Sequence, residues 1–168
     1  ADLPYAVSQG FSPHMKMAFG AALPVGVGGD EEIFDVQLTE YVAPERALER
    51  LRAASADDLM PHAARYITKE DAAASVAYPF STYHAVLAFD DGRDDDAALQ
   101  QAVASCEIPE QIVVVRKKKE KVLVPSEFIV GEMERDGASL TFTLEAKKTG
   151  SLRPDVLLDA MLANMGLH

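Results

Sequence analysis

Residues 128–146 read FIVGEMERDGASLTFTLEA and carry a strong local signal for the fold. Apolar and polar residues alternate on both sides of Asp136-Gly137, and an Asp-Gly pair between alternating segments marks a tight hairpin turn. We therefore predict a β-hairpin with strands at 128–134 and 139–146. Strands joined by such a short turn run antiparallel, so the second half of the chain is expected to contain an antiparallel sheet.

The other elements of the second half are predicted from shorter patterns around this hairpin. Apolar runs and alternation favour strands, and apolar residues at helical spacing favour helices. The expected strands are 84–89, 111–116 and 121–124, and the expected helices are 94–105, with aspartates in its first turn, and 154–165.

The first half begins with an extended, irregular segment at 5–20, because Pro13, Gly10 and Gly20 oppose regular structure. A strand follows at 33–39, where apolar and polar residues alternate. The remaining elements expected in this half are a helix that begins at Pro44, a short strand within 59–67 and a short helix within 69–76.

These elements together predict an α+β fold with antiparallel sheets and helices on one face. The order suggests ferredoxin-like units, of which the first lacks its opening strand and helix. The expected domains are 1–78, a partial ferredoxin-like unit, and 79–168, a second α+β unit that packs with the first as one globule. The chain has no initiator Met, so we expect an upstream segment that is absent from this sequence.

Composition excludes several kinds of site. Cys106 is the only cysteine among 168 residues, so an internal disulfide is impossible and an iron–sulfur cluster lacks its thiolates. The same shortage disfavours structural zinc, and we expect no cofactor. No apolar run approaches the ~18 residues of a membrane helix. No signal peptide is evident, so we expect a cytoplasmic protein without membrane contact.

The charge of the chain is −11, and such an acidic protein repels the phosphate backbone of nucleic acids at long range. The run Arg116-Lys117-Lys118-Lys119-Glu120-Lys121 is a basic exception between two predicted strands. Two interpretations stay open for it. Its side chains contact a polyanion such as RNA, although no aromatic stacking partner lies nearby, or they protect a sheet edge from aggregation.

The glycine run at 26–29 does not form a nucleotide-binding loop. Glu31 stands where the pattern GxGxxG requires its last glycine, and the neighbouring acidic residues would repel a pyrophosphate. We predict instead the turn of a hairpin between 20–27 and 33–39.

Residues 8–20, SQGFSPHMKMAFG, hold the side chains of the first half that are best suited to binding or catalysis. The structural interpretation is a rigid turn in which Phe11 and Phe19 anchor the segment in the core. The functional interpretation is a binding site that uses Gln9, Phe11, His14 and Lys16, with His14 and Lys16 facing an anion. No GxSxG elbow accompanies Ser12, so nucleophilic catalysis has little support.

Residues 4–40, PYAVSQGFSPHMKMAFGAALPVGVGGDEEIFDVQLTE, resemble a bacterial radical S-adenosylmethionine (radical SAM)-associated domain of unknown function. In that family the segment is similar to YSQGFxPHPKxSFGPALPLGVES, followed by YxDVELxE. VVRKKKEK and GSLRPDVLLDAM resemble a basic segment and a closing element of the same family. The matching residues of the first segment are Tyr5, Ser8, Gln9, Gly10, Phe11, Pro13, His14, Lys16, Phe19, Gly20, Ala22, Leu23, Pro24, Gly26, Val27, Asp35 and Val36.

The chain departs from the family pattern in three ways. Met15 replaces a proline, the preceding strand and helix of the family are absent, and so is the CxxxCxxC motif of the radical SAM module. The resemblance therefore implies an accessory domain that recognises a substrate or partner and is non-catalytic alone. The expected partners are a radical SAM protein or its substrate, RNA, and a second copy through an open sheet edge.

Two alternatives to the accessory domain stay open. One is an RNA-binding module linked to ribosome or RNA modification, in which Lys16 and the basic run, with Arg116, Lys117, Lys118 and Lys119, contact phosphates. The other is an enzyme with its site at His14 and Lys16.

Overall fold

The computed structural model describes residues 2–68, 70–89, 92, 94–116 and 118–163. Contacts divide the chain into two units. Unit 1 comprises residues 1–22 and 29–78, and unit 2 comprises residues 23–28 and 79–168. The predicted packing of the two halves as one globule stays a prediction. Among the described residues, no helix combines the length and apolar character that crossing a bilayer requires.

Unit 1 is built on a small antiparallel sheet of β1 (Met17–Phe19) and β2 (Phe34–Val36). Gly20 N–H donates to the Ile33 carbonyl at 2.9 Å, so β1 and β2 form a hairpin. Its first strand lies at 17–19, within the segment predicted to be irregular, and the strand predicted at 20–27 is wrong. The segment before β1 joins the same ladder, because Ala6 N–H donates to Gln37 and Lys16 N–H donates to Ala6. Residues 5–8, 14–19 and 34–38 thus form one hydrogen-bonded layer.

The helix of unit 1, α1 (Pro44–Ala54), begins at the predicted proline. Pro44 occupies the first turn, where the missing N–H of proline breaks no hydrogen bond of the helix. The negative charge of Glu45 in the same turn interacts favourably with the positive end of the helix dipole. A 3₁₀ turn, η1 (Asp57–Leu59), and the short helix α2 (Ala74–Ala77) complete the unit. The helix predicted within 69–76 is therefore present, shifted toward its C-terminal end.

The strand predicted within 59–67 is wrong. Leu59 belongs to the 3₁₀ turn η1, and residues 60–67 have no regular secondary structure and join no ladder. The Arg52 side chain forms hydrogen bonds with two backbone carbonyls of this segment. Its Nε donates to the Pro61 carbonyl at 2.7 Å, and its Nη2 donates to the His62 carbonyl at 3.0 Å. A guanidinium, and not a neighbouring strand, therefore satisfies these two carbonyls.

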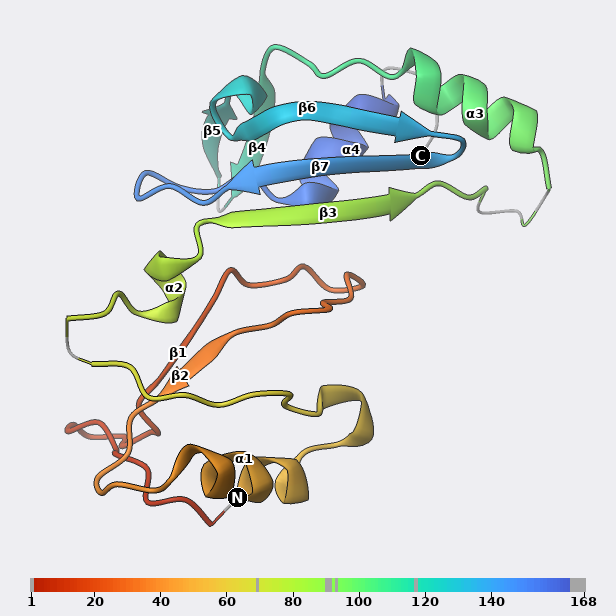
Figure 1. Ribbon diagram of the computed structural model, residues 1–168. Coiled ribbons are helices and arrows are strands. Elements are labelled where there is room, and N and C mark those ends of the chain that lie inside the picture. The colour runs from red at the N-terminus through yellow and green to blue at the C-terminus, as the bar shows by residue number, and fades with distance from the viewer. Residues whose placement is uncertain (1, 69, 90–91, 93, 117, 164–168) are drawn as a thin grey trace. The chain divides into compact units, whose positions relative to one another are not determined.

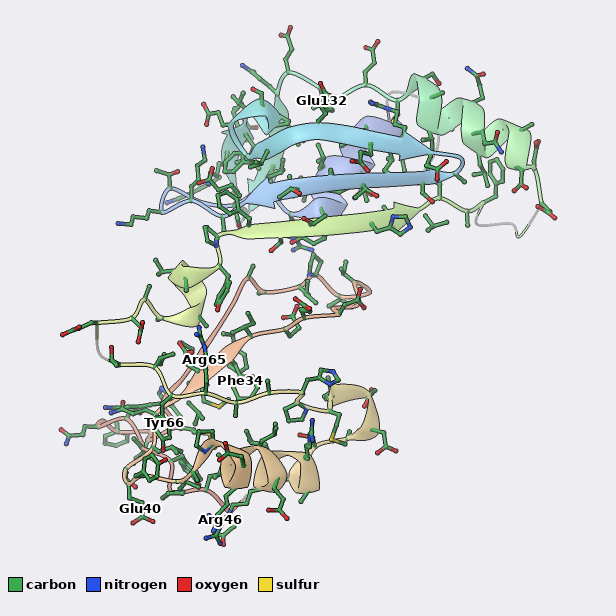
Figure 2. All side chains as sticks on the ribbon, in the orientation of Figure 1. Phe34, Glu40, Arg46, Arg65, Tyr66 and Glu132 are labelled. Carbon is green, nitrogen blue, oxygen red and sulfur yellow. The ribbon has the colours of Figure 1, made fainter. Side chains whose placement is uncertain are left out.

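Long-range bonds from side chains to backbone hold the segments of unit 1 together. Figure 2 labels Tyr66, whose hydroxyl donates to the Val42 carbonyl and accepts from the Val42 N–H, both at 2.9 Å. Asp35 accepts from the N–H of Ala74 at 2.6 Å and so ties β2 to α2. Apolar burial is small by comparison: the buried apolar residues of unit 1, within the described part of the chain, are Leu3, Ala6 and Ala74.

Unit 2 contains a three-stranded antiparallel sheet in the order β3-β7-β6 (Figure 1). Its strands are β3 (Phe80–Val86), β6 (Ile129–Asp136) and β7 (Ser139–Glu145). The predicted hairpin is confirmed, with its turn one residue later than expected. Asp136 still pairs with Ser139, and Gly137, at φ +55°, opens the two-residue loop, as glycine does in a type II′ turn.

Two helices cover one face of this sheet. In α3 (Asp96–Ser105), the predicted aspartate start is confirmed, since the Asp95 side chain accepts from the Ala98 N–H at 3.1 Å as an N-cap. The second helix is α4 (Pro154–Ala163); the end of the helix predicted to 165 lies outside the described residues. Apolar side chains of both helices pack with those of β7 in one core. The most buried residues of this core are Val103, Leu140, Phe142, Leu157 and Met161.

A second hairpin is inserted between α3 and β6. It consists of β4 (Ile112–Arg116) and β5 (Lys119–Leu123), followed by the 3₁₀ turn η2 (Pro125–Glu127). Without this insertion the order of unit 2 is strand, helix, strand, strand, helix, with the sheet order first-third-second. That is the arrangement of the first five elements of a ferredoxin-like unit. The predicted α+β class, with antiparallel sheets, is confirmed.

Candidate functional site

The SQGFSPH segment of unit 1 forms a loop that is closed at its base. The Ser8 N–H donates to the His14 carbonyl at 2.8 Å, and the His14 N–H donates to the Ser8 hydroxyl at 3.1 Å. His14 Nδ1 lies 3.0 Å from the Ser12 carbonyl oxygen, which can only accept, so Nδ1 is the donor. In the neutral ring Nε2 is then an acceptor, which does not suit an anion.

Phe11 stands at the tip of this loop and is fully exposed. The predicted anchoring of Phe11 in the core is therefore wrong, and Phe19 is also largely exposed, although its ring lies 6.1 Å from that of Phe34. The physical reason is the closure between Ser8 and His14. Because backbone bonds already fix the base of the loop, residues 9–13 project away from the sheet and need no core contact.

Gln9, Phe11 and His14 are brought together on this loop, and Lys16 follows where the chain enters the ladder. All four are exposed. No hydrogen bond or ion pair joins His14 to Lys16, both of which the structure describes. The arrangement is therefore an exposed recognition loop with one projecting ring, and it shows no acid–base pair.

Of the predicted basic residues of unit 2, those that the structure describes lie at the tip of the β4–β5 hairpin. Arg116 ends β4 and pairs with Lys119, the first residue of β5, and Lys118 adopts a left-handed conformation with φ +63° in the turn. Lys117 lies outside the described residues. Lys118 and Lys119 are exposed, so this hairpin presents cations to solvent.

The structure adds two lysines to this group that the sequence interpretation missed. Lys121 Nζ donates to the Thr149 carbonyl at 3.5 Å, which brings the turn at 147–150 beside β5. Lys147 and Lys148 stand in that turn, and both are exposed. We call Lys118, Lys119, Lys121, Lys147 and Lys148 the basic surface. A weak signal was available, since residues 147–150 directly follow the predicted strand 139–146, but only tertiary contacts join the two runs.

Partners already occupy part of the basic surface. Lys147 Nζ lies 3.6 Å from a Glu145 carboxylate oxygen and 5.9 Å from the centre of the Phe128 ring. Lys148 has neither contact. Lys148 is therefore the better choice for a variant that removes a cation without disturbing local packing.

Metal-ligand groups, depressions and shifted pKa values among the described residues suggest no further site. No group of three or more His, Cys, Asp and Glu side chains among them could hold a metal ion. A shallow depression of about 640 Å³ in unit 2 is lined by residues 108–111 with Val124, Ser126, Ile129 and Gly131, and Glu110 is the one ionisable residue among these. In unit 1, hydrogen bonds from the Thr68 N–H and hydroxyl lower the pKa of Asp71 below its ordinary value of 3.8.

The fold and these two surfaces define an α+β protein with an exposed aromatic loop in one unit and a basic hairpin in the other. Residues 1–154 match the family DUF2344, described as an uncharacterized protein conserved in bacteria, and the chain belongs to that family. The expected domain of unknown function is thereby confirmed. No curated protein and no solved structure matches the chain.

Proposed function

We propose that the chain is an accessory recognition module, which binds a radical SAM protein through the loop at 8–14 while the chemistry takes place on that partner. The observation that carries this proposal is Phe11, a fully exposed aromatic ring on a loop closed by three hydrogen bonds. Large aromatic side chains dominate binding energy at interfaces. A loop that is ordered before binding also loses less conformational entropy on association.

The rest of the layer supports an interface in the same region. Unit 1 buries few apolar side chains of its own, yet the ladder around the loop exposes several, namely Tyr5, Val7, Met15, Met17 and Phe19. Contiguous exposed apolar surface marks interaction sites in soluble proteins. The resemblance of residues 4–40 to a radical SAM-associated domain supports the choice of partner.

Replacing Phe11 by alanine is expected to weaken binding to the purified radical SAM protein of the same genome by about tenfold or more, as loss of a hot-spot ring does. Isothermal titration calorimetry measures this affinity. Val25→Ala is the matched control, because Val25 is as fully exposed as Phe11 but lies outside the loop. Absence of binding by the unmodified chain, or equal losses in both variants, would contradict the proposal.

Binding of RNA to the basic surface is the second candidate function. The observation that favours it is the contact between Lys121 and Thr149, which places lysines from two separate runs on one surface. Each lysine that contacts a phosphate releases counterions and makes the affinity depend on salt.

For this candidate, Lys148→Glu is expected to weaken binding to a fluorescent single-stranded RNA and to lower the slope of log affinity against log salt by about 0.7. Fluorescence anisotropy at several salt concentrations measures both quantities. Arg46→Glu changes the net charge equally from an exposed position on α1 and serves as the control. No binding at low salt would remove this candidate.

A further inference from the structure

Two methionines, Met15 and Met17, lie on one face of the hydrogen-bonded layer in unit 1. They are two positions apart in an extended segment, and residues at this spacing point to the same face of a strand. Met15 pairs with Val7 and Met17 pairs with Val36, so the residues directly opposite them are apolar. Met15 is 39% exposed and Met17 is 38% exposed, so solvent reaches both residues.

The same face carries further exposed apolar residues. Tyr5 is two positions from Val7, and Phe19 is two positions from Met17. We call Tyr5, Val7, Met15, Met17 and Phe19 the apolar face of unit 1, and each of them is at least 38% exposed. The tyrosine hydroxyl is the only hydrogen-bond donor among these five side chains, and it can donate only one bond.

Two methionines of unit 2 are protected from solvent. Met133 is 8% exposed and Met161 is fully buried, and both belong to the core of that unit. Peroxide must reach the sulfur atom, so we expect exposed methionines to react before buried ones. The chain therefore contains an internal reference against which oxidation of the exposed pair can be measured.

Hydrogen peroxide converts a methionine thioether into a sulfoxide. A sulfur lone pair attacks one peroxide oxygen, the S–O bond forms as the O–O bond breaks, and the second oxygen leaves as water with both hydrogens. The sulfur is oxidised by two electrons, and the peroxide is reduced by two. The product side chain is polar, and methionine sulfoxide reductases reverse the step.

We propose that Met15 and Met17 form an oxidation site through which peroxide weakens the association of unit 1 with its partner protein. This inference rests on the proposed function, in which the loop at 8–14 and the apolar face contact that partner. The loop leads directly into the site, because Met15 follows His14. Burying a polar group without a hydrogen bond is unfavourable, and one tyrosine hydroxyl cannot serve two sulfoxides.

Peroxide treatment of the full chain, followed by trypsin digestion and mass spectrometry, tests the selectivity of the site. Cleavage after Lys16 places Met15 and Met17 in separate peptides, so each rate is measured on its own. We expect both to form sulfoxide about tenfold faster, or more, than Met133 and Met161. Circular dichroism confirms that the chain stays folded during the treatment. Equal rates at the exposed and the core methionines would overturn the proposal.

Isothermal titration calorimetry with the purified radical SAM protein of the same genome tests the consequence. The chain alone is oxidised, and peroxide is removed before mixing. Oxidation is expected to raise the Kd by about tenfold, and methionine sulfoxide reductases of both epimer specificities are expected to restore it. An unchanged Kd after oxidation would overturn this proposal and leave the proposed function intact. Absence of binding before oxidation would contradict the proposed function and this inference together.

Two variants identify the methionines responsible. The double variant Met15→Leu, Met17→Leu keeps apolar side chains, and peroxide is expected to leave its Kd unchanged, whatever the starting value. Met133→Leu is the matched control, because it removes a core methionine and is expected to lose affinity on oxidation as the unmodified chain does. Met60, which is partly buried, is present in all of these proteins. Equal losses on oxidation in the double variant and the control would overturn the proposal.

Discussion

Phe142→Ala is expected to lower the free energy of unfolding of unit 2 by about 3–5 kcal/mol, the usual cost of removing a buried phenylalanine. Phe142 lies in the central strand β7 with 1% of its surface exposed, and its ring is 5.7 Å from that of Tyr83. The cavity would open between the sheet and the helices α3 and α4, where the core of unit 2 is concentrated. A domain has only about 5–15 kcal/mol of stability, so this loss is severe.

Urea unfolding, with amide hydrogen exchange of β7 as the probe specific to unit 2, measures this effect. Phe80→Ala is the control, because Phe80 lies on the same sheet but is 56% exposed on the uncovered face. It is expected to cost far less when measured at low protein concentration. Similar losses in the two variants would show that the described core is not the one that stabilises unit 2.

Asp35→Ala is expected to destabilise unit 1 by about 1–3 kcal/mol, the penalty for a buried donor left without an acceptor. Asp35 accepts from the N–H of Ala74 at 2.6 Å, and Ala74 is among the few buried residues of this unit. Since unit 1 has so little apolar burial, one long-range hydrogen bond is a large share of what holds β2 to α2.

Amide exchange at Ala74 and the urea midpoint of unit 1 measure the loss. Asp35→Asn keeps an acceptor oxygen and is expected to retain most of the stability. Glu31→Ala removes the same charge from an exposed position and is expected to leave the midpoint unchanged. A loss as large in Glu31→Ala would mean that net charge, and not the bond to Ala74, decides the result.

Sequence patterns predicted helix starts correctly where a residue nearby in the sequence provides the hydrogen-bond partner or the backbone geometry that the helix start needs. Aspartates stand at the start of α3 and Pro44 begins α1, as predicted, because both effects act within one helical turn. The loop at 8–14 shows the limit. Gly10 and Pro13 correctly predicted a turn, but the burial of Phe11 depended on a core that this part of unit 1 does not have.

Contacts between distant segments could not be predicted. No pattern in the sequence shows that Arg52 takes the carbonyls of Pro61 and His62, or that Lys121 reaches Thr149 and extends the predicted basic run to Lys148. These contacts join residues 9 to 28 positions apart, and periodicity describes only the chain's own neighbours. The candidate site on unit 2 was thus predicted in part, from one of its two segments.

Sequence patterns were enough to predict the α+β class, the hairpin at 128–146 and the starts of α1 and α3, because turn and capping preferences depend on short-range sterics and hydrogen bonds. The order β3-β7-β6, in contrast, became known only from the three-dimensional structure. Sheet order depends on how apolar faces from separate segments bury one another, and that free energy belongs to the whole chain and to no short stretch of it.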